Sequence, residues 1–277
     1  ISLTGLKGGH SGVDIHLGRA NANKLMFRFL KEAVRDYGVR LSSIDGGSLR
    51  NAIPREAFAI ITIPGDNVEA LWELVSDYQE MYRSEYKGIE HNINFTAEMT
   101  DMPATLIPEE IQDDLINAIE GCQNGVISML VDFPGTVESS TNLAIVKSSN
   151  EMIEIQILVR SSSESHKEAV CSSLESIFSL AGAKVEYSDG YGGWQPNIDS
   201  PILKIMQQAY LDLYGKKPEA KVMHAGLECG IIQESYPDMD MISIGPDLQH
   251  PHSPDERVSI PSVARTWDFI VTTLARI

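Results

Sequence analysis

The hydrophobic positions of the chain recur with two different spacings. Apolar residues placed every three to four positions, with polar residues between them, predict amphipathic helices because this spacing lines one helix face. Helices are predicted in this way over residues 21–38, 65–86, 108–122, 165–182, 201–215 and 260–277. Gly38 and Gly182 stand where two of these helices should end, and glycine readily adopts the left-handed conformation that ends a helix.

The second spacing is that of strands. Short runs rich in β-branched and aromatic residues, bounded by glycine, proline or asparagine, predict strands because such side chains pack well on a pleated surface. These runs cover residues 1–9, 39–47, 55–64, 91–99, 125–132, 141–161, 183–191 and 239–246. The run over 141–161 predicts a hairpin whose turn lies at residues 148–150.

The order of these elements predicts an α/β protein. Strands and helices follow one another as strand, helix, strand, strand, helix, strand over about residues 1–100, and a similar order recurs over 101–190. We therefore predict that residues 1–190 form an α+β domain of two linked, ferredoxin-like (βαββαβ-like) halves, with antiparallel strands backed by helices. The repeat is one of element order and not of residue identity.

A glycine- and proline-rich stretch predicts the boundary between two domains. It is GYGGWQPNIDSP, residues 190–201. Residues 191–277 then contain few predicted strands, so their hydrophobic core is expected to be thin and to complete a domain whose remainder lies elsewhere. The first residue is Ile1 and not a methionine, and we expect the sequence to be part of a longer protein.

Charge and cysteine content narrow the classes of partner. The 277 residues carry a formal net charge of −17 at pH 7, which disfavours nucleic acids and anionic membrane surfaces because their phosphates would be repelled. No run of about 18 apolar residues predicts a membrane span. The three cysteines are widely spaced and form no Cys-X-X-Cys pair, so no disulfide framework is predicted and a cytoplasmic location fits best.

His10 is the first candidate for chemistry because it lies between glycines in GGHSG. Glycines on both sides let the backbone turn tightly and approach a ligand, which would present the imidazole to a substrate oxygen. The alternative is a turn histidine without a role. A phosphate-binding loop is a third reading, but GLKGGHSG lacks the GxGxxG spacing and the Gly-Lys-Ser/Thr ending of such loops.

His252 is the second candidate and lies in GPDLQHPHSPDE, after the predicted strand 239–246. Prolines stiffen this loop, and the carboxylates of Asp255 and Glu256 could orient the ring through its second nitrogen, an arrangement that suits a metal ligand. His250 is the rival ligand, and the residues alone do not decide between the two histidines.

The remaining candidates are weaker. In VMHAGLECG, His224 and Glu228 are spaced as two metal ligands on a helix would be, but Gly226 between them favours a loop whose backbone contacts a ligand. Asn51 and Arg160 stand at the edges of predicted strands, where a side chain can lean into a cleft. On residue type alone both are ordinary surface residues.

Four stretches together resemble one family. They are GLKGGHSGVDIHLGRANANK, RNAIPREA, VMHAGLECG and YPDMDMISIGPDLQHPHSPDE. In this order they are similar to the aminoacyl-histidine dipeptidases (Xaa-His dipeptidases, peptidase D) of the di-zinc metallopeptidase and aminoacylase superfamily. The resemblance covers the whole chain but begins partway through the family pattern, after the His-X-Asp motif, the bridging aspartate and the Glu-Glu pair.

This resemblance implies a domain organisation and a partner. Residues 1–190 would be the lid domain, and residues 191–277 the C-terminal part of the catalytic domain. In such enzymes two zinc ions activate a water for attack on the peptide bond of a dipeptide substrate. Lid domains of this superfamily often pair between chains, so a homodimer is a further implied partner.

The resemblance also implies roles for individual residues. His252 would be a zinc ligand, and His10 would be a catalytic residue that stabilises the oxyanion of the tetrahedral intermediate. Asn51, Arg160 and Gly226 would bind the substrate, and the guanidinium of Arg160 would face its carboxylate.

The catalytic glutamate and the other ligands of the family precede this region. We therefore predict that the full-length protein is a metallo-dipeptidase and that the 277 residues alone are inactive. The rival hypothesis is a lid, dimerisation or binding module without catalysis.

Overall fold

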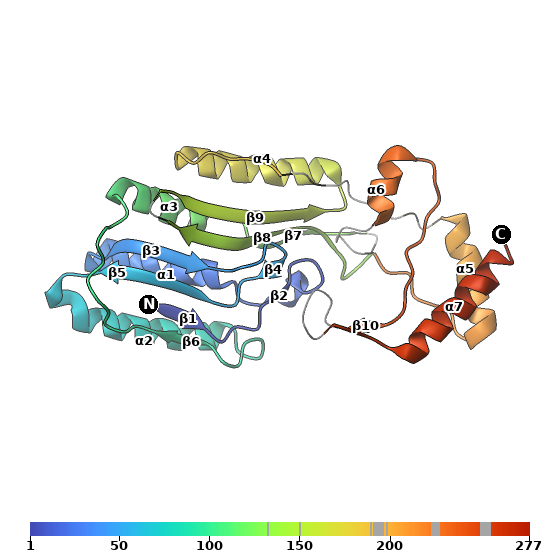
Figure 1. The fold of residues 1–277 in the computed structure, drawn as a ribbon, viewed down its shortest axis with the longest axis horizontal. Coiled ribbons are helices and arrows are strands. Elements are labelled where there is room, and N and C mark those ends of the chain that lie inside the picture. The colour runs from blue at the N-terminus through green and yellow to red at the C-terminus, as the bar shows by residue number, and fades with distance from the viewer. Residues whose placement is uncertain are drawn as a thin grey trace. The chain divides into compact units, whose positions relative to one another are not determined.

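The computed structural model describes residues 1–277 except residues 132, 150, 189, 191–196, 198, 223–227 and 250–255 and the side chain of residue 234. The described part forms two compact units, the first within Ile1–Asp189 and the second within Gly190–Val222 and Gly226–Ile277 (Figure 1). The fold class is mixed α/β with antiparallel sheets, as the sequence predicted.

Every predicted helix is present. The first unit contains α1 (Ala22–Tyr37), α2 (Val68–Glu85), α3 (Glu109–Gly121) and α4 (Glu164–Leu180), and the second contains α5 (Pro201–Tyr214), α6 (Glu228–Ser235) and α7 (Ile260–Leu274). The short helix α6 was not predicted. It begins directly after residues 223–227, which lie outside the described part.

Local sequence explains the bounds of α1. At its start the side chain of Asn21 accepts a hydrogen bond from the Lys24 amide, which satisfies a backbone N–H that has no partner within the helix. At its end Gly38 has a φ of 68° and donates its N–H to the Ala33 carbonyl. A side chain at this φ would be strained, so the prediction that Gly38 ends the helix is confirmed.

One antiparallel sheet forms the base of the first unit. Its strands are β1 (Ser2–Thr4), β3 (Arg40–Gly46), β5 (Ala57–Thr62), β6 (Asn94–Thr96), β7 (Gly125–Met129), β8 (Val137–Ser148) and β9 (Ile153–Ser161). Their order is β6-β1-β5-β3-β8-β7, and β9 also pairs with β8. A separate two-stranded sheet joins β2 (Gly9–His10) to β4 (Ala52–Ile53).

The two predicted halves share this sheet, but only the first has the βαββαβ order, because residues 101–188 form α3, β7, β8, β9 and α4 without the predicted closing strand. The strands β6-β1-β5-β3, with α1 and α2 between them in the chain, have the ferredoxin-like order. β8 joins the halves, because Lys147 and Val146 near its end pair with β3 while its first residues pair with β7. β8 is 12 residues long and can therefore hold two neighbours along one edge and β9 along the other.

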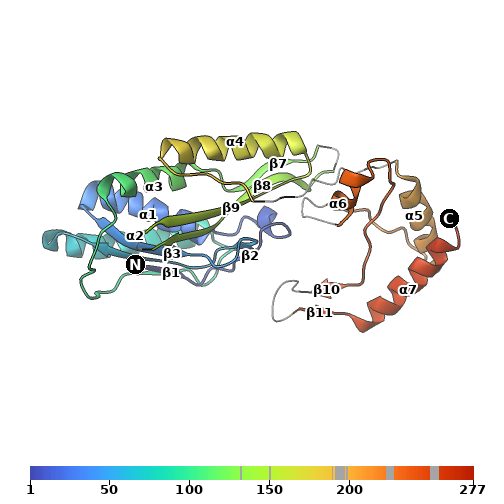
Figure 2. The ribbon, with the colours of Figure 1, turned by 45° about the horizontal axis from the view of Figure 1, so that its top comes forward.

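The helices α1 to α4 cover one face of the sheet (Figure 2). Leu3 and Leu41 point from the strands into this layer, where they join Phe27 and Phe29 of α1, and all four side chains are fully buried. Burial of one such aromatic side chain stabilises a fold by about 1.5–3 kcal/mol, and α1 contributes two of them to the core. Alternation along β5 leaves Phe58 half-exposed on the opposite face.

Two predicted strands are wrong. Residues 183–188 and 239–246 form no strand in the structure, and the second segment, which was expected to be buried, is mostly exposed. The described strands include none that runs beside either segment. A strand without a neighbour leaves its backbone N–H and C=O groups unpaired, so an apolar run alone is not sufficient to form one.

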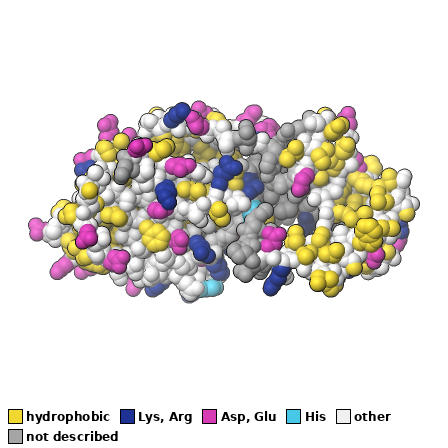
Figure 3. Space-filling model, viewed as in Figure 1, with side chains coloured by type: hydrophobic (Ala, Val, Ile, Leu, Met, Phe, Trp, Pro, Cys, Tyr) yellow, Lys and Arg dark blue, Asp and Glu magenta, His cyan; other side chains and the backbone are white. Residues whose placement is uncertain are grey.

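The second unit has a small core. Met206 and Ala209 of α5 pack against Phe269 of α7, and a short hairpin joins β10 (Leu248–Gln249) to β11 (Arg257–Val258). Hydrophobic side chains cover much of the visible surface of α5 and α7 (Figure 3). None of the described helices is both long and apolar enough to cross a membrane.

Candidate functional site

The small sheet β2–β4 brings His10 next to Asn51. His10 pairs with Ala52 across this sheet, and the Ser11 amide donates a hydrogen bond of 2.9 Å to the Asn51 carbonyl. Glycines before His10 and the turn after it allow the two segments to approach closely. Two candidates that are far apart in the sequence are therefore neighbours in the structure.

Arg160 reaches the same place from the other half of the first unit. It lies near the end of β9, opposite Ser140 of β8, and its Nε donates to the hydroxyl of Ser11 at 3.4 Å. Ser11 is buried and directly follows His10. The structure therefore brings together His10, Asn51 and Arg160, which had been singled out separately.

Asn142 of β8 supports this arrangement and was missed in the sequence. Its side-chain amide donates to the carbonyls of Ala52 at 2.7 Å and Arg50 at 3.5 Å, on either side of Asn51. The residue is buried, so each of these hydrogen bonds satisfies a polar group away from water. The available signal was an amide side chain inside the otherwise apolar strand TNLAIV.

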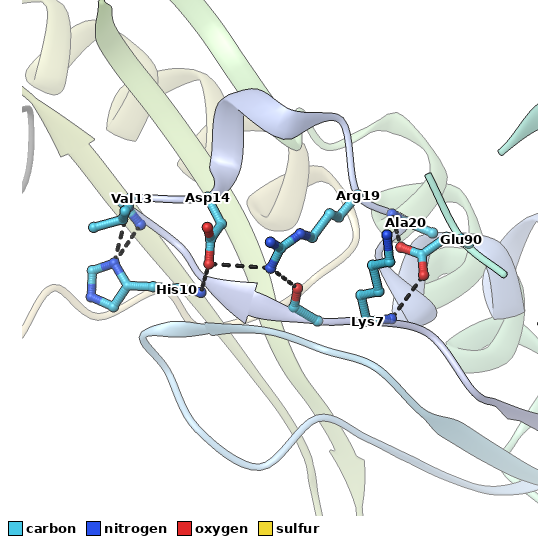
Figure 4. A network of polar contacts seen from close by, with 9 residues as sticks. Lys7, His10, Val13, Asp14, Arg19, Ala20 and Glu90 are labelled. Carbon is cyan, nitrogen blue, oxygen red and sulfur yellow. Dashed lines mark hydrogen bonds and ion pairs between the residues drawn. The ribbon is translucent and has the colours of Figure 1, made fainter. Parts of the chain in front are cut away.

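The segment that carries His10 is held by two carboxylates (Figure 4). Asp14 accepts a hydrogen bond from the His10 amide at 2.9 Å and forms an ion pair with Arg19 at 3.2 Å. Glu90 is buried and accepts hydrogen bonds from the amides of Lys7 at 2.8 Å and Ala20 at 3.1 Å. These two amides lie on either side of residues 8–19, so Glu90 ties the base of the segment together.

Comparison with known proteins places the chain in a family. A family model described as Peptidase family M20/M25/M40 matches residues 54–276. The chain belongs to this family. A second model, described as Peptidase dimerisation domain, matches residues 1–90.

This M20/M25/M40 peptidase chain is similar to two proteins that are named as dipeptidases. The cytosol non-specific dipeptidase of Escherichia coli (strain K12) is 42% identical over 277 residues, which are 100% of this chain and 57% of the relative. The crystal structure of aminoacylhistidine dipeptidase from Vibrio alginolyticus matches with a TM-score of 0.90 and 43% identity, over 100% of this chain and 56% of the other. The chain spans little more than half the length of these relatives, and the matches confirm the resemblance drawn from its motifs.

The other predicted site residues of this peptidase chain are not described. Gly226 and His252 lie outside the described residues, as do His224 and His250, whereas Glu228 is the first residue of α6. Among the described residues, no group of three or more His, Cys, Asp and Glu side chains is arranged to hold a metal ion. The described part therefore does not form a metal site by itself, and the roles of Gly226 and His252 stay predictions.

A cavity of about 410 Å³ lies near the candidate residues but does not contain them. It is lined by His16 of the 3-10 helix Ile15–Leu17, by Arg19 and Asn21 of the segment that leads into α1, by Lys24 of α1 and by Asn124 just before β7. The ammonium group of Lys24 already donates to the carbonyls of Ile119, Glu120 and Cys122 at the end of α3. Arg19 pairs with Asp14, and the side chains of Asn21 and Asn124 bond to each other, so the polar lining is largely engaged and the convergence at His10 is the stronger candidate site.

Proposed function

We propose that this chain forms the lid domain, residues 1–190, and the C-terminal part of the catalytic domain, residues 191–277, of a zinc-dependent cytoplasmic dipeptidase. The proposed substrates are Xaa-His and related dipeptides. Family membership, the names of the two relatives and the two-unit organisation support this proposal. The single observation that carries it is the convergence of His10, Asn51 and Arg160.

Each of these residues has a role that its chemistry can perform. His10 would donate a hydrogen bond to the carbonyl oxygen of the scissile peptide bond as that oxygen becomes negatively charged. One such donor lowers the barrier by roughly 3–4 kcal/mol. Arg160 would bind the C-terminal carboxylate of the dipeptide through its planar guanidinium, while Asn51 and the backbone of Gly226 would hold the peptide.

His252 is the proposed ligand for one of two zinc ions. When bound, these ions would supply the activated water that attacks the peptide carbonyl. The family's His-X-Asp motif, bridging aspartate and catalytic Glu-Glu pair are not in this sequence, so the remaining ligands and the general base would come from residues of the longer protein. For the same reason we propose that the 277 residues alone do not hydrolyse dipeptides.

Hydrolysis of β-alanyl-histidine and glycyl-histidine in the presence of zinc tests this proposal. The 277-residue chain should show no turnover, whereas the full-length protein should hydrolyse one or both dipeptides. In the full-length protein, His10→Ala should lower kcat by about 10²–10³-fold, as loss of one oxyanion donor does. His16→Ala is the matched control, because His16 is an exposed histidine of the same segment, and it should leave kcat unchanged.

Three results would contradict the proposal. They are turnover by the 277-residue chain at enzyme-like rates, a full-length protein that hydrolyses neither dipeptide, and a His10→Ala variant as active as His16→Ala.

A second candidate function is a lid or dimerisation module without catalysis. It is favoured by the match of residues 1–90 to the model described as Peptidase dimerisation domain. The proposed partner is then a second copy of the chain. We propose neither a nucleic acid nor a membrane as a partner, because the net charge of −17 would repel their phosphates. Light scattering over a range of concentrations, together with a zinc titration, separates the two functions. For the full-length protein, a dimer without zinc affinity favours the module, whereas zinc binding that His252→Ala weakens favours the enzyme.

A further inference from the structure

The imidazole of His10 is fixed through one of its two nitrogens. Its Nδ1 accepts hydrogen bonds from the amides of Gly12 at 3.1 Å and Val13 at 3.0 Å (Figure 4). A ring nitrogen that accepts a hydrogen bond carries no hydrogen itself, so the hydrogen of the neutral ring lies on Nε2. We infer that Asp14 is a positioning residue that holds His10 as the Nε2–H tautomer.

Asp14 closes the turn that supplies these two amides. Its side chain accepts from the His10 amide at 2.9 Å, and its own amide donates to the His10 carbonyl at 2.9 Å. Residues 10 and 14 are thereby joined twice, and the chain between them must turn back on itself. This turn directs the Gly12 and Val13 amides toward Nδ1.

Arg19 holds the Asp14 carboxylate in place. Its Nη1 lies 3.2 Å from Asp14 Oδ2 and donates to the Gly8 carbonyl at 2.6 Å. The side chains of Asp14 and Arg19 are 25% and 22% exposed, so solvent screens this ion pair less than it screens a surface pair. The ion pair also accounts for a glycine of GGHSG, because a Cβ on Gly9 would overlap both Arg19 Nη1 and Asp14 Oδ2.

The tautomer decides whether His10 can donate or accept a proton in the reaction. This part of the inference rests on the proposed function. A ring with its hydrogen on Nε2 donates from Nε2 and cannot accept a proton there. Its Nδ1 is engaged by two amides. His10 is therefore suited to donate to a developing oxyanion and unsuited to act as a general base.

Nitrogen-15 NMR of the 277-residue chain, labelled at histidine, tests the tautomer directly and without any activity. The ring signals of His10 are assigned by their loss in His10→Ala. In the unmodified chain at neutral pH, Nε2 should show the shift of a protonated ring nitrogen and Nδ1 that of an unprotonated acceptor. A protonated Nδ1, or averaging between the two tautomers, would overturn the inference.

Variants of Asp14 test its role. Asp14→Ala should let both tautomers of His10 become populated. Asp14→Asn should retain more of the Nε2–H form, because an amide oxygen can still accept from the His10 backbone although it loses the charge opposite Arg19. Asp36→Ala removes the exposed Asp–Arg pair at the end of α1 and should leave the His10 signals unchanged. If the Asp14→Asn variant folds, and both it and Asp14→Ala show the same His10 signals as the unmodified chain, Asp14 has no positioning role.

Kinetics of the full-length protein separate this inference from the proposed function. Asp14→Ala should lower kcat by about 10²-fold, as a misplaced catalytic group does, with little change in KM, and Asp14→Asn should recover part of the loss. A fixed Nε2–H tautomer in a protein that hydrolyses no dipeptide would uphold the inference and contradict the proposed function. An active enzyme whose His10 carries its hydrogen on Nδ1 would do the opposite.

Discussion

The two units of the chain bury their hydrophobic side chains to very different extents. In the first unit, Phe27 and Phe29 are fully buried between the sheet and its helices. In the second, Phe269 packs in a small core, while Trp267 and Leu274 of the same helix are 66% and 65% exposed. Because burial of apolar surface is the main driving force of folding, the first unit should be much the more stable of the two.

This difference bears on the candidate site. His10, Asn51 and Arg160 all belong to the first unit, where backbone and side-chain hydrogen bonds fix the segments that carry them. His252 belongs to the sequence that follows and lies outside the described residues. These three residues are therefore arranged by the first unit alone, without help from the proposed metal ligand.

The largest effect expected from this comparison is that of core truncation. Phe29→Ala should lower the free energy of unfolding of the first unit by about 3–5 kcal/mol, because it leaves a cavity among Tyr78, Phe95 and the sheet. Phe269→Ala should cost the second unit less, about 1–3 kcal/mol, since fewer neighbours surround this ring. Urea unfolding with hydrogen exchange read separately for α1 and α7 measures both changes. Equal costs would show that the two cores do not differ as described.

A second test compares two glycines with positive φ. Gly47 has a φ of 77°, and a Cβ there would overlap the Ala144 carbonyl oxygen, whereas Gly215 has a φ of 69° and open space around it. Both Gly→Ala variants should suffer the left-handed strain of about 1–2 kcal/mol. Gly47→Ala should lose a further 1–3 kcal/mol or so, because the strands around it must shift.

Unfolding midpoints in urea check this difference, with Gly88→Ala as a control in the first unit. Gly88 has a φ of 88° and nothing near its Cβ position, so its variant should behave like Gly215→Ala. A Gly47→Ala variant no less stable than these two would contradict the tight packing between β3 and β8.

The sequence predicted the fold well where local pattern decides it. Helix periodicity and terminal glycines located α1 to α5 and α7, and the run over 141–161 was correctly interpreted as the hairpin β8–β9. The runs 183–191 and 239–246 failed because strand formation needs a neighbouring strand, which no local pattern reports. The joining of two halves through β3 and β8 is a long-range pairing and was not predicted either.

Much of the candidate site depends on contacts between distant residues. Asp14 and Arg19 stand inside the quoted motif GLKGGHSGVDIHLGRANANK, so charged residues beside a glycine turn were an available signal that went unused. Glu90 gave no such signal, because the amide of Ala20 that it binds is 70 residues away. Such a carboxylate looks like any helix-end or surface acid until the fold is known.

The smallest effect concerns pH. The side chain of Glu138 accepts a hydrogen bond from the hydroxyl of Ser128 at 2.7 Å and pairs with His166 at 2.7 Å, joining β7, β8 and α4. The Ser128 hydroxyl, and then His166, hold the pKa of Glu138 below its ordinary value of 4.5, although burial opposes them. A carboxyl whose pKa is lower in the folded state stabilises the fold above about pH 4.5, and this contribution is lost as the pH falls through the folded pKa.

Glu138→Gln should therefore destabilise the first unit at pH 7 by less than about 1 kcal/mol, because His166 is half-exposed, and the difference should shrink below about pH 4.

The second unit offers a counterpart. Asp212 of α5 pairs with Arg276 beyond α7, which holds the pKa of Asp212 low, so Arg276→Met should weaken the acid dependence of that unit alone. Unfolding curves at pH 7 and about pH 3.5, followed by hydrogen exchange in α4 and α7, compare the two. If each substitution shifted the unfolding of α4 and α7 equally, the two units would unfold in a single transition. The difference between their cores would then not give them different stabilities.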